Sequence, residues 1–482
     1  MLFNSTQFLI FFPVVTIFYF LFYPKHRWIL LLISSIIFYM AFIPQYILII
    51  FLLIVIDFFA GILIEKSKKT KRKAFLILSI VSNIGLLSFF KYFNFWGSNF
   101  NYLASLLHFN LSLPYLSIIL PVGLSFHVFQ SLSYTIEVFR KKQKAERNIG
   151  IYALYVMFYP QLVAGPIERP QNLLSQLHQV HKFEESRVFN GLKLMLWGLF
   201  KKMVIADRLA FLVNQVYSSP SSFSGLTLLI ATYFFAFQIY CDFSGYTDIA
   251  IGAAQVMGIK LMENFNRPYF SKSVSEFWKR WHISLSSWFR DYLYIPLGGS
   301  RVSRLVWARN IIIVFLISGL WHGASWKYVV WGGLHGSFIL LEAGTLGLRK
   351  KIIALLRIGE NLSSIVSIFV TFNLVSFAWI FFRANSIQEA IIIVKLIFRD
   401  LVNFDILGKA NFYLSKFRFE FIIAVFLIFF MELIHYIERH NQMREMFCSK
   451  PLVFRWFIYY LLILMIIFLG VFQQVKFIYF QF

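Results

Sequence analysis

One histidine in this sequence lies inside an apolar stretch, where an ionisable side chain is rare. His322 belongs to the segment Ser318-Gly-Leu-Trp-His-Gly-Ala-Ser-Trp326, within an apolar run from Asn310 to Leu341. An imidazole can take up or release a proton near neutral pH. Burying a full charge in hydrocarbon costs about 2.5–3.5 kcal/mol, so such a side chain usually faces a cavity, a partner or a substrate path. His322 is therefore either a proton-transfer group or a histidine that only bonds a neighbouring helix.

A second histidine, His282, lies in a stretch whose periodicity predicts one amphipathic helix over 277–293. The apolar stripe of this helix consists of Phe277, Trp281, Leu285, Trp288 and Tyr292, and the polar stripe of Lys279, His282, Ser286 and Arg290. Such a helix can lie across a cavity with its polar stripe turned inward. A histidine on an interfacial helix often only meets water, so both interpretations of His282 stay open.

Two carboxylates, Asp242 and Asp248, occur in the apolar run 226–257. Unpaired carboxylates at membrane depth would be protonated, so each is expected to have a cationic partner. The candidate partners are Arg267, Lys279 and Arg280. The pairing would serve either as a structural ion pair or as a proton relay.

Small residues surround His322 and predict close helix packing. Gly319 and Gly323 form one small-xxx-small step, and Gly332 and Gly336 form a second step beside His335. Such steps let two membrane helices approach closely.

The composition indicates a protein that crosses a membrane many times. Of the 482 residues, 59% are hydrophobic and 14% are charged. The apolar runs repeatedly reach the ~18–20 residues needed to span a bilayer. A soluble core cannot bury so much apolar length, and the alternation typical of a membrane β-barrel is missing. The sequence therefore predicts an all-α polytopic membrane protein, with about eleven transmembrane helices plus re-entrant and interfacial helices.

The net charge of +24 indicates anionic lipid headgroups rather than nucleic acid as the partner, because Lys and Arg gather in short turns between apolar runs. These basic turns are 25–27, 66–73 and 140–147, and the turns that alternate with them, 43–45 and 95–120, carry no charged residue. Basic turns usually face the cytoplasm, so the N-terminus is expected outside. The first apolar run, near residues 8–23, is expected to be a retained helix. The turn 95–120 is expected to hold a short helix on the membrane surface.

Two later segments are irregular. The segment 158–170 combines apolar residues with three prolines and a glycine, which predicts broken backbone in a re-entrant segment or funnel wall. The run 189–213 carries Lys201 and Lys202, so it should face an interface or the helix bundle rather than lipid. Gln130 and Gln161 are most simply interpreted as interhelical hydrogen-bonding residues.

Cofactor and metal sites are not indicated. Cys241 and Cys448 lie far apart in the sequence and predict neither a disulfide framework nor a metal site. His178 and His181 have helical spacing but lie in a polar connection with no cysteine near, so we interpret them as solvated. The sequence also lacks a phosphate loop, a nucleophile elbow and a dinucleotide fingerprint.

Several segments in order resemble a known family. They are Pro121-Val-Gly-Leu-Ser-Phe-His-Val-Phe-Gln130, Tyr159-Pro-Gln-Leu-Val-Ala-Gly-Pro166, Phe277-Trp-Lys-Arg-Trp-His-Ile-Ser-Leu285 with Arg290-Asp-Tyr-Leu-Tyr-Ile-Pro-Leu-Gly-Gly299, Gly319-Leu-Trp-His-Gly-Ala324 and Trp379-Ile-Phe-Phe-Arg-Ala384. The set resembles the membrane-bound O-acyltransferases (MBOAT), and within them the bacterial branch of alginate O-acetyltransferases. Lys279 and Phe139 depart mildly from the family pattern, where Arg and Tyr are expected.

The resemblance implies a ring of tilted helices around a thinned centre, with a cytosolic and an outer funnel that meet at a histidine. It implies that His322 is the essential intramembrane histidine and that His282 is the second polar position. The residues expected to bind substrate or line the tunnel are Lys279, Arg280, Asp242, Gln130, Gln161, Trp321 and Ser318. The expected division is N-terminal helices over 1–114, a catalytic core over 115–345 and C-terminal helices over 346–482, all in one integral domain.

The implied activity is transfer of an acyl group, most simply acetyl, from a cytosolic thioester to an extracytoplasmic polysaccharide hydroxyl across a bacterial inner membrane. The donor is a substrate, either acetyl-CoA or an acyl carrier, and no bound cofactor is expected. A separate extracytoplasmic acetyltransferase is the expected partner. Two alternatives stay open, D-alanyl transfer to teichoic acid and a transporter or glycan flippase, although the paired interruptions of a transporter are not visible.

Overall fold

The structure of the protein, a computed structural model, describes residues 1–163, 165–402, 411–437, 450–472 and 477–478. All regular elements in these ranges are helices, with no strand, so the all-α prediction is confirmed. The chain groups into two compact units, Met1–Met195 with Tyr246–Glu263 and Leu196–Gly245 with Asn264–Gln481. The predicted three-part division of the sequence stays a prediction.

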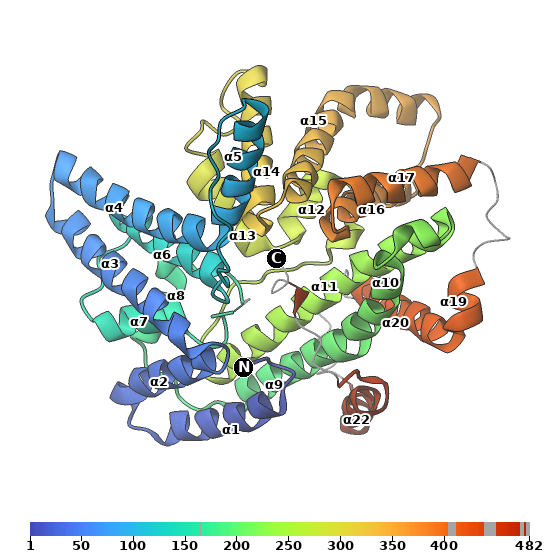
Figure 1. The fold of residues 1–482 in the computed structure, drawn as a ribbon. Helices are drawn as coiled ribbons and strands as arrows, with labels where there is room; N and C mark the ends of the chain where they lie inside the picture. The colour runs from blue at the N-terminus through green and yellow to red at the C-terminus, as the bar shows by residue number, and fades with distance from the viewer. Residues whose placement is uncertain (164, 403–410, 438–449, 473–476, 479–482) are drawn as a thin grey trace. The chain divides into compact units, whose positions relative to one another are not determined.

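The first unit is a bundle in which α3 packs on both α4 and α6 (Figure 1). Its helices are α1 Thr6–Leu21, α2 Arg27–Met40, α3 Ile47–Lys66, α4 Lys69–Leu87, α5 Phe93–Leu106, α6 Leu124–Phe139, α7 Ile149–Met157, α8 Pro170–Leu177 and most of α9 Glu185–Leu199. The carboxylate of Asp57 lies fully buried in this bundle and accepts hydrogen bonds from Ser79 at 2.6 Å and Asn83 at 2.8 Å. These two donors compensate for the loss of water around the carboxylate.

The second unit contains the hairpin of α14 and α15, with α16 beside α15 (Figure 1). Its helices are α10 Asp207–Tyr217, most of α11 Gly225–Val256, α12 Val274–Arg280, α13 Ile283–Phe289, α14 Arg304–His322, α15 Trp326–Leu355, α16 Glu360–Arg383, α17 Ile387–Val402, α19 Asn411–Lys416, α20 Arg418–Ile437 and α22 Leu452–Leu469. Between α9 and α10 the chain forms a π-helical segment, Phe200–Ala206, in which Lys201 and Lys202 are buried. The prediction that these lysines face the bundle rather than lipid is confirmed.

Helices long and apolar enough to cross a membrane occur throughout the described chain. Eight segments meet this description: Pro44–Lys66, Lys69–Leu106, Gly225–Val256, Arg304–His322, Trp326–Leu355, Glu360–Arg383, Arg418–Ile437 and Leu452–Leu469. The protein is therefore an integral membrane protein. The number of about eleven spans stays a prediction.

The expected surface helix in the turn 95–120 takes a different form. A helix is present there as α5, but it continues α4 through a π-helical turn, Ser88–Tyr92, so that Lys69–Leu106 forms one long helix. No proline or glycine occurs between residues 88 and 96 to stop the helix. The predicted short helix is therefore present, and its position on the membrane surface stays a prediction.

The broken backbone predicted over 158–170 is confirmed. Helix α7 ends at Met157 and α8 begins at Pro170, and Phe158 and Tyr159 between them are fully buried. The carboxylate of Glu168 accepts hydrogen bonds from the Asn172 side chain and the Met262 backbone. Burial is the main cause that raises the pKa of Glu168 to about 7. Whether this segment is re-entrant or lines a funnel stays a prediction.

The glycine steps around the hairpin pack as predicted. A Cβ atom added to Gly319 would lie 2.1 Å from the carbonyl oxygen of Tyr328 and 3.3 Å from the Cα of Gly332. A Cβ on Gly332 would lie 2.1 Å from the carbonyl oxygen of Phe315. Only glycine at both positions permits this approach of α14 and α15.

Candidate active site

His322 lies at the corner of the α14–α15 hairpin. It is the last residue of α14, Gly323 continues in extended backbone with φ −167°, and α15 begins at Trp326. The sequence indicated only an apolar run through this position, and the structure divides that run into two helices. The corner is anchored to the end of α16, because the Lys327 ammonium donates to the carbonyl oxygen of Ala384 at 2.7 Å.

Aromatic rings surround the imidazole of His322, whose side chain is buried. The ring centroid lies 4.9 Å from that of Trp331, 5.0 Å from Trp321 and 5.4 Å from Phe382. All three pairs are nearly perpendicular, with interplanar angles of 86°, 78° and 75°. Edge-to-face pairs of this kind are favourable and restrict the orientation of the imidazole.

The helix predicted over 277–293 is interrupted at His282, so the prediction of one continuous helix is wrong. His282 has left-handed backbone with φ +43°, a conformation uncommon for a residue other than glycine. Asn264 stabilises the break. Its carbonyl oxygen accepts from the Ile283 N–H at 2.9 Å, and its side-chain oxygen accepts from the Ser284 N–H at 3.2 Å.

The break changes the environment of His282. Lys279 of the predicted polar stripe is exposed, whereas His282 is fully buried, with its ring 4.7 Å from Phe243 and 6.2 Å from Trp321. Burial lowers the pKa of His282 to about 3, so its imidazole is neutral at physiological pH. A neutral imidazole can donate one hydrogen bond and accept another.

The structure brings some of the predicted site residues together. The Trp321 ring contacts both His282 and His322, and Ser318 is buried one helical turn before His322. Arg280 instead pairs with Glu276 at 2.7 Å, on the helix that precedes the break. Roles for Lys279 and Arg280 in binding substrate stay predictions.

Asp242 has a partner that the sequence did not indicate. Its carboxylate lies 2.6 Å from the ammonium of Lys202, which also lies 2.7 Å from the carboxylate of Asp207. The Ile478 N–H donates to the other Asp242 oxygen at 2.8 Å. The predicted pairing of Asp242 with Arg267, Lys279 or Arg280 is therefore wrong, because the π-helical segment turns Lys202 inward to α11.

Gln130 and Gln161 belong to the first unit. Both side-chain amides donate to the carbonyl oxygen of Tyr155, the Gln161 amide at 3.1 Å. The Gln130 bond joins α6 to α7 and confirms the predicted interhelical bond. Gln161 lies in the non-helical connection after α7 and bonds back to α7, so the interhelical prediction is wrong for Gln161. A role of either side chain in a tunnel stays a prediction.

The sequence did not predict which residues surround His322. Trp331 and Phe382 contact its imidazole from α15 and α16, and no sequence pattern indicates that these two helices bring them there. It also missed a bond between α12 and α15, in which the Trp278 indole N–H donates to Nδ1 of the fully buried His335 at 3.3 Å. Cys448 lies outside the described residues, whereas Cys241 is a buried free cysteine.

The bond between Trp278 and His335 predicts a coupled pair of stability effects. Trp278→Phe removes the donor and should lower the free energy of unfolding by about 0.5–1.5 kcal/mol beyond the loss of ring packing. His335→Leu leaves the indole N–H without its acceptor and should cost about 1–3 kcal/mol. We expect the double variant to lose less free energy of unfolding than the two single variants lose in total. Strict additivity would contradict a direct bond.

Comparison with known proteins places this site in a family. Residues 70–382 match the family model described as MBOAT, membrane-bound O-acyltransferase family. The chain is 38% identical over 399 residues to the probable alginate O-acetylase AlgI of Pseudomonas aeruginosa, an alignment that covers 81% of this chain and 73% of that protein. The chain belongs to the membrane-bound O-acyltransferase family. It is therefore an O-acyltransferase, and the matched region contains both His282 and His322.

Two further relatives of this MBOAT protein are named for different activities. It is 34% identical over 366 residues to the peptidoglycan O-acetyltransferase of Helicobacter pylori, covering 70% of this chain and 67% of the relative. It is 29% identical over 282 residues to the teichoic acid D-alanyltransferase of Streptococcus thermophilus, covering 54% of this chain and 68% of the relative. The two O-acetyltransferase relatives thus align over more of this chain and at higher identity than the D-alanyltransferase.

Proposed function

We propose that this MBOAT protein transfers an acetyl group from a cytosolic thioester donor to hydroxyls of an extracytoplasmic polysaccharide. The buried His322 imidazole, fixed among Trp321, Trp331 and Phe382, is the observation that carries the proposal. The activities for which the alginate and peptidoglycan relatives are named support acetyl as the group and a polysaccharide as the acceptor class.

In the proposed mechanism His322 acts as a general base. Its neutral imidazole takes the proton of the acceptor hydroxyl while the hydroxyl oxygen forms a bond to the thioester carbonyl carbon. The carbon–sulfur bond then breaks, the ester is released, and the thiolate recovers the proton from the imidazolium. General-base assistance of this kind typically contributes about 10²–10⁴-fold to the rate.

His282 is the best candidate for stabilising the oxyanion that forms on the carbonyl oxygen. It is buried and neutral, and it contacts the same Trp321 ring as His322. A hydrogen-bond donor in a site that excludes water stabilises developing charge more strongly than an exposed one does. The exposed Lys279 and the paired Arg280 fit this role less well.

Transfer from one side of a membrane to the other needs access from both. We expect the ring of about eleven spans, the thinned centre and the two funnels that are typical of the family, in a bacterial inner membrane with the N-terminus outside. The hairpin corner with His322 lies at the opposite end of α15 from the basic residues 349–351. If residues 349–351 lie in the cytoplasm, as basic residues usually do, His322 lies toward the extracytoplasmic side, from which the acceptor arrives.

A separate extracytoplasmic acetyltransferase is the proposed partner that completes delivery to the polymer. Affinity capture of the tagged protein from membranes should recover such a partner. If the purified protein alone acetylated polymer at the rate seen in membranes, the partner would be unnecessary.

The donor is tested by supplying two labelled donors side by side to membranes that contain the protein. Acetyl from acetyl-CoA should appear in ester linkage on surface glycan, whereas D-alanine from an aminoacyl carrier protein should not. Preferential D-alanyl transfer would favour the teichoic acid alternative. Acceptor export without any ester formation would favour a transporter.

A further inference from the structure

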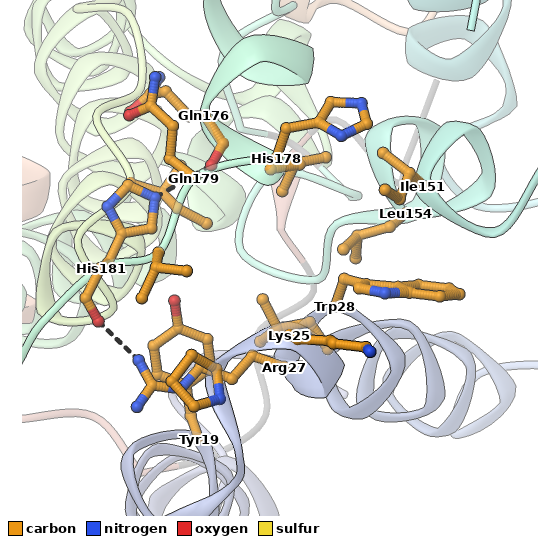
Figure 2. Close-up of a pocket in the computed structure, with 15 residues that line it drawn as sticks. Tyr19, Lys25, Arg27, Trp28, Ile151, Leu154, Gln176, His178, Gln179 and His181 are labelled. Atoms are coloured by element: carbon orange, nitrogen blue, oxygen red, sulfur yellow. Dashed lines mark hydrogen bonds between the residues drawn. The ribbon is translucent and has the colours of Figure 1, made fainter. Parts of the chain in front are cut away.

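The turn between α1 and α2, together with the start of α2, forms one wall of a cavity in the first unit. Figure 2 shows Lys25 on the turn and Arg27 and Trp28 at the start of α2, opposite the segment that carries His178 and His181. The cavity has a volume of about 290 Å³. Its lining includes the formal positive charges of Lys25 and Arg27 but no Asp or Glu. The charge of the wall therefore suits an anion.

The guanidinium of Arg27 is fixed in place before any ligand arrives. It donates to the carbonyl oxygens of His181 at 2.6 Å, Phe20 at 3.2 Å and Phe22 at 3.3 Å, and the first of these bonds is drawn in Figure 2. Carbonyl oxygens orient a guanidinium but do not neutralise its charge. The guanidinium also lies over the ring of Tyr19, 5.0 Å from its centroid, and that contact does not neutralise the charge either.

Lys25 supplies the second cation, and its side chain is exposed. Among the residues that the structure describes, neither Lys25 nor Arg27 forms an ion pair with a carboxylate. The nearby pairs of His178 with Glu146 at 2.7 Å and of Arg187 with Glu184 at 3.5 Å use carboxylates that do not line the cavity. Both cations thus keep their charge for a ligand.

Exposed apolar residues adjoin the lining of the cavity, and we refer to them as its apolar rim. Val180 lines the cavity, and Leu21, Tyr23 and Phe183 lie within three residues of lining residues in the sequence; they have 58%, 75%, 68% and 62% of their surface accessible. In a membrane protein, exposed apolar side chains beside a basic turn mark the boundary between acyl chains and headgroups. A ligand here would meet cations in the cavity and apolar surface at its edge.

We infer that this cavity binds the phosphate headgroup of an anionic glycerophospholipid, with the acyl chains along the apolar rim. Basic pockets between helices on the cytoplasmic side of membrane proteins bind such headgroups. Inorganic phosphate and the phosphates of coenzyme A share the same anionic chemistry, but neither molecule has the long acyl chains that would lie along the apolar rim. The site is independent of the residues proposed for acyl transfer.

The test measures lipid retention by the full-length protein in detergent, using native mass spectrometry with added phosphatidylglycerol or phosphatidylcholine. Wild-type protein should retain phosphatidylglycerol preferentially. A basic residue near a membrane surface contributes about fivefold in affinity for anionic lipid. Lys25→Gln should therefore weaken phosphatidylglycerol binding about fivefold, and Lys25→Glu about 25-fold.

Lys68→Glu is the matched control, because Lys68 is an exposed lysine in another basic turn and does not line the cavity. It should change phosphatidylglycerol binding less than about twofold. An equal loss in Lys68→Glu and Lys25→Glu would mean general surface attraction and overturn the site. Displacement of the lipid by inorganic phosphate or coenzyme A at lower concentration would overturn the assignment to a lipid. If Lys25→Glu does not fold, the fivefold loss expected for Lys25→Gln still tests the site.

Discussion

Replacement of His322 by alanine is expected to lower the rate of acyl transfer by about 10²–10⁴-fold. Alanine cannot accept the hydroxyl proton, so the acceptor oxygen would have to attack the thioester without a base. The imidazole lies among the rings of Trp321, Trp331 and Phe382, and none of these aromatic side chains can accept the proton in its place. Initial rates with labelled donor in membranes of matched protein content measure the effect.

His26→Ala is the control for this prediction, because His26 is an exposed histidine in the turn between α1 and α2. It should transfer acyl groups at the wild-type rate. Loss of transfer in His322→Ala is informative only if the variant inserts and elutes as the wild type does in detergent. A well-folded His322→Ala protein with an undiminished rate would exclude His322 as the base.

Replacement of Lys202 by methionine is expected to destabilise the second unit by about 3–5 kcal/mol. Its ammonium lies 2.7 Å from Asp207 and 2.6 Å from Asp242, and all three side chains are buried. Without the cation, two buried carboxylates would face each other, and one must be protonated or the segment must open. The temperature of unfolding and the yield of monodisperse protein in detergent measure this loss.

Lys260→Met gives the control, since the Lys260 side chain is exposed, and it should unfold at the wild-type temperature. Adding Asp242→Asn to Lys202→Met removes the excess negative charge and should recover part of the stability. Wild-type unfolding of the Lys202→Met variant would show that the buried ion pair contributes nothing to the fold.

Much of the fold follows from sequence because membrane helices must satisfy their own backbone hydrogen bonds. Apolar runs such as 46–64 and 362–382 therefore predict α3 and α16 closely. The broken segment 158–170 was also predictable, since prolines cannot continue a helix. In both cases the structure depends on interactions between residues close in the sequence, so the sequence alone predicts it.

The remaining features depend on contacts between distant segments. Helical periodicity continues through His282, and only the capping bonds from Asn264 explain why the helix stops there. Lys202 and Asp242 form an ion pair although they are 40 positions apart in the sequence. Lys202 lies in the π-helical segment Phe200–Ala206, which no sequence pattern predicted. His282 and His322 could be predicted as site residues. Trp321 could be predicted only as a tunnel residue, and its contact with both histidines could not.

If the proposed function is right, this protein places acetyl esters on a surface glycan through His322. Mass spectrometry of cell-surface glycans from cells without the protein, with the wild type and with His322→Ala tests this directly. We expect ester-linked acetyl groups only with the wild type, and we expect mild base to remove them. Identical acetylation in all three samples, with each protein present in the membrane, would contradict it.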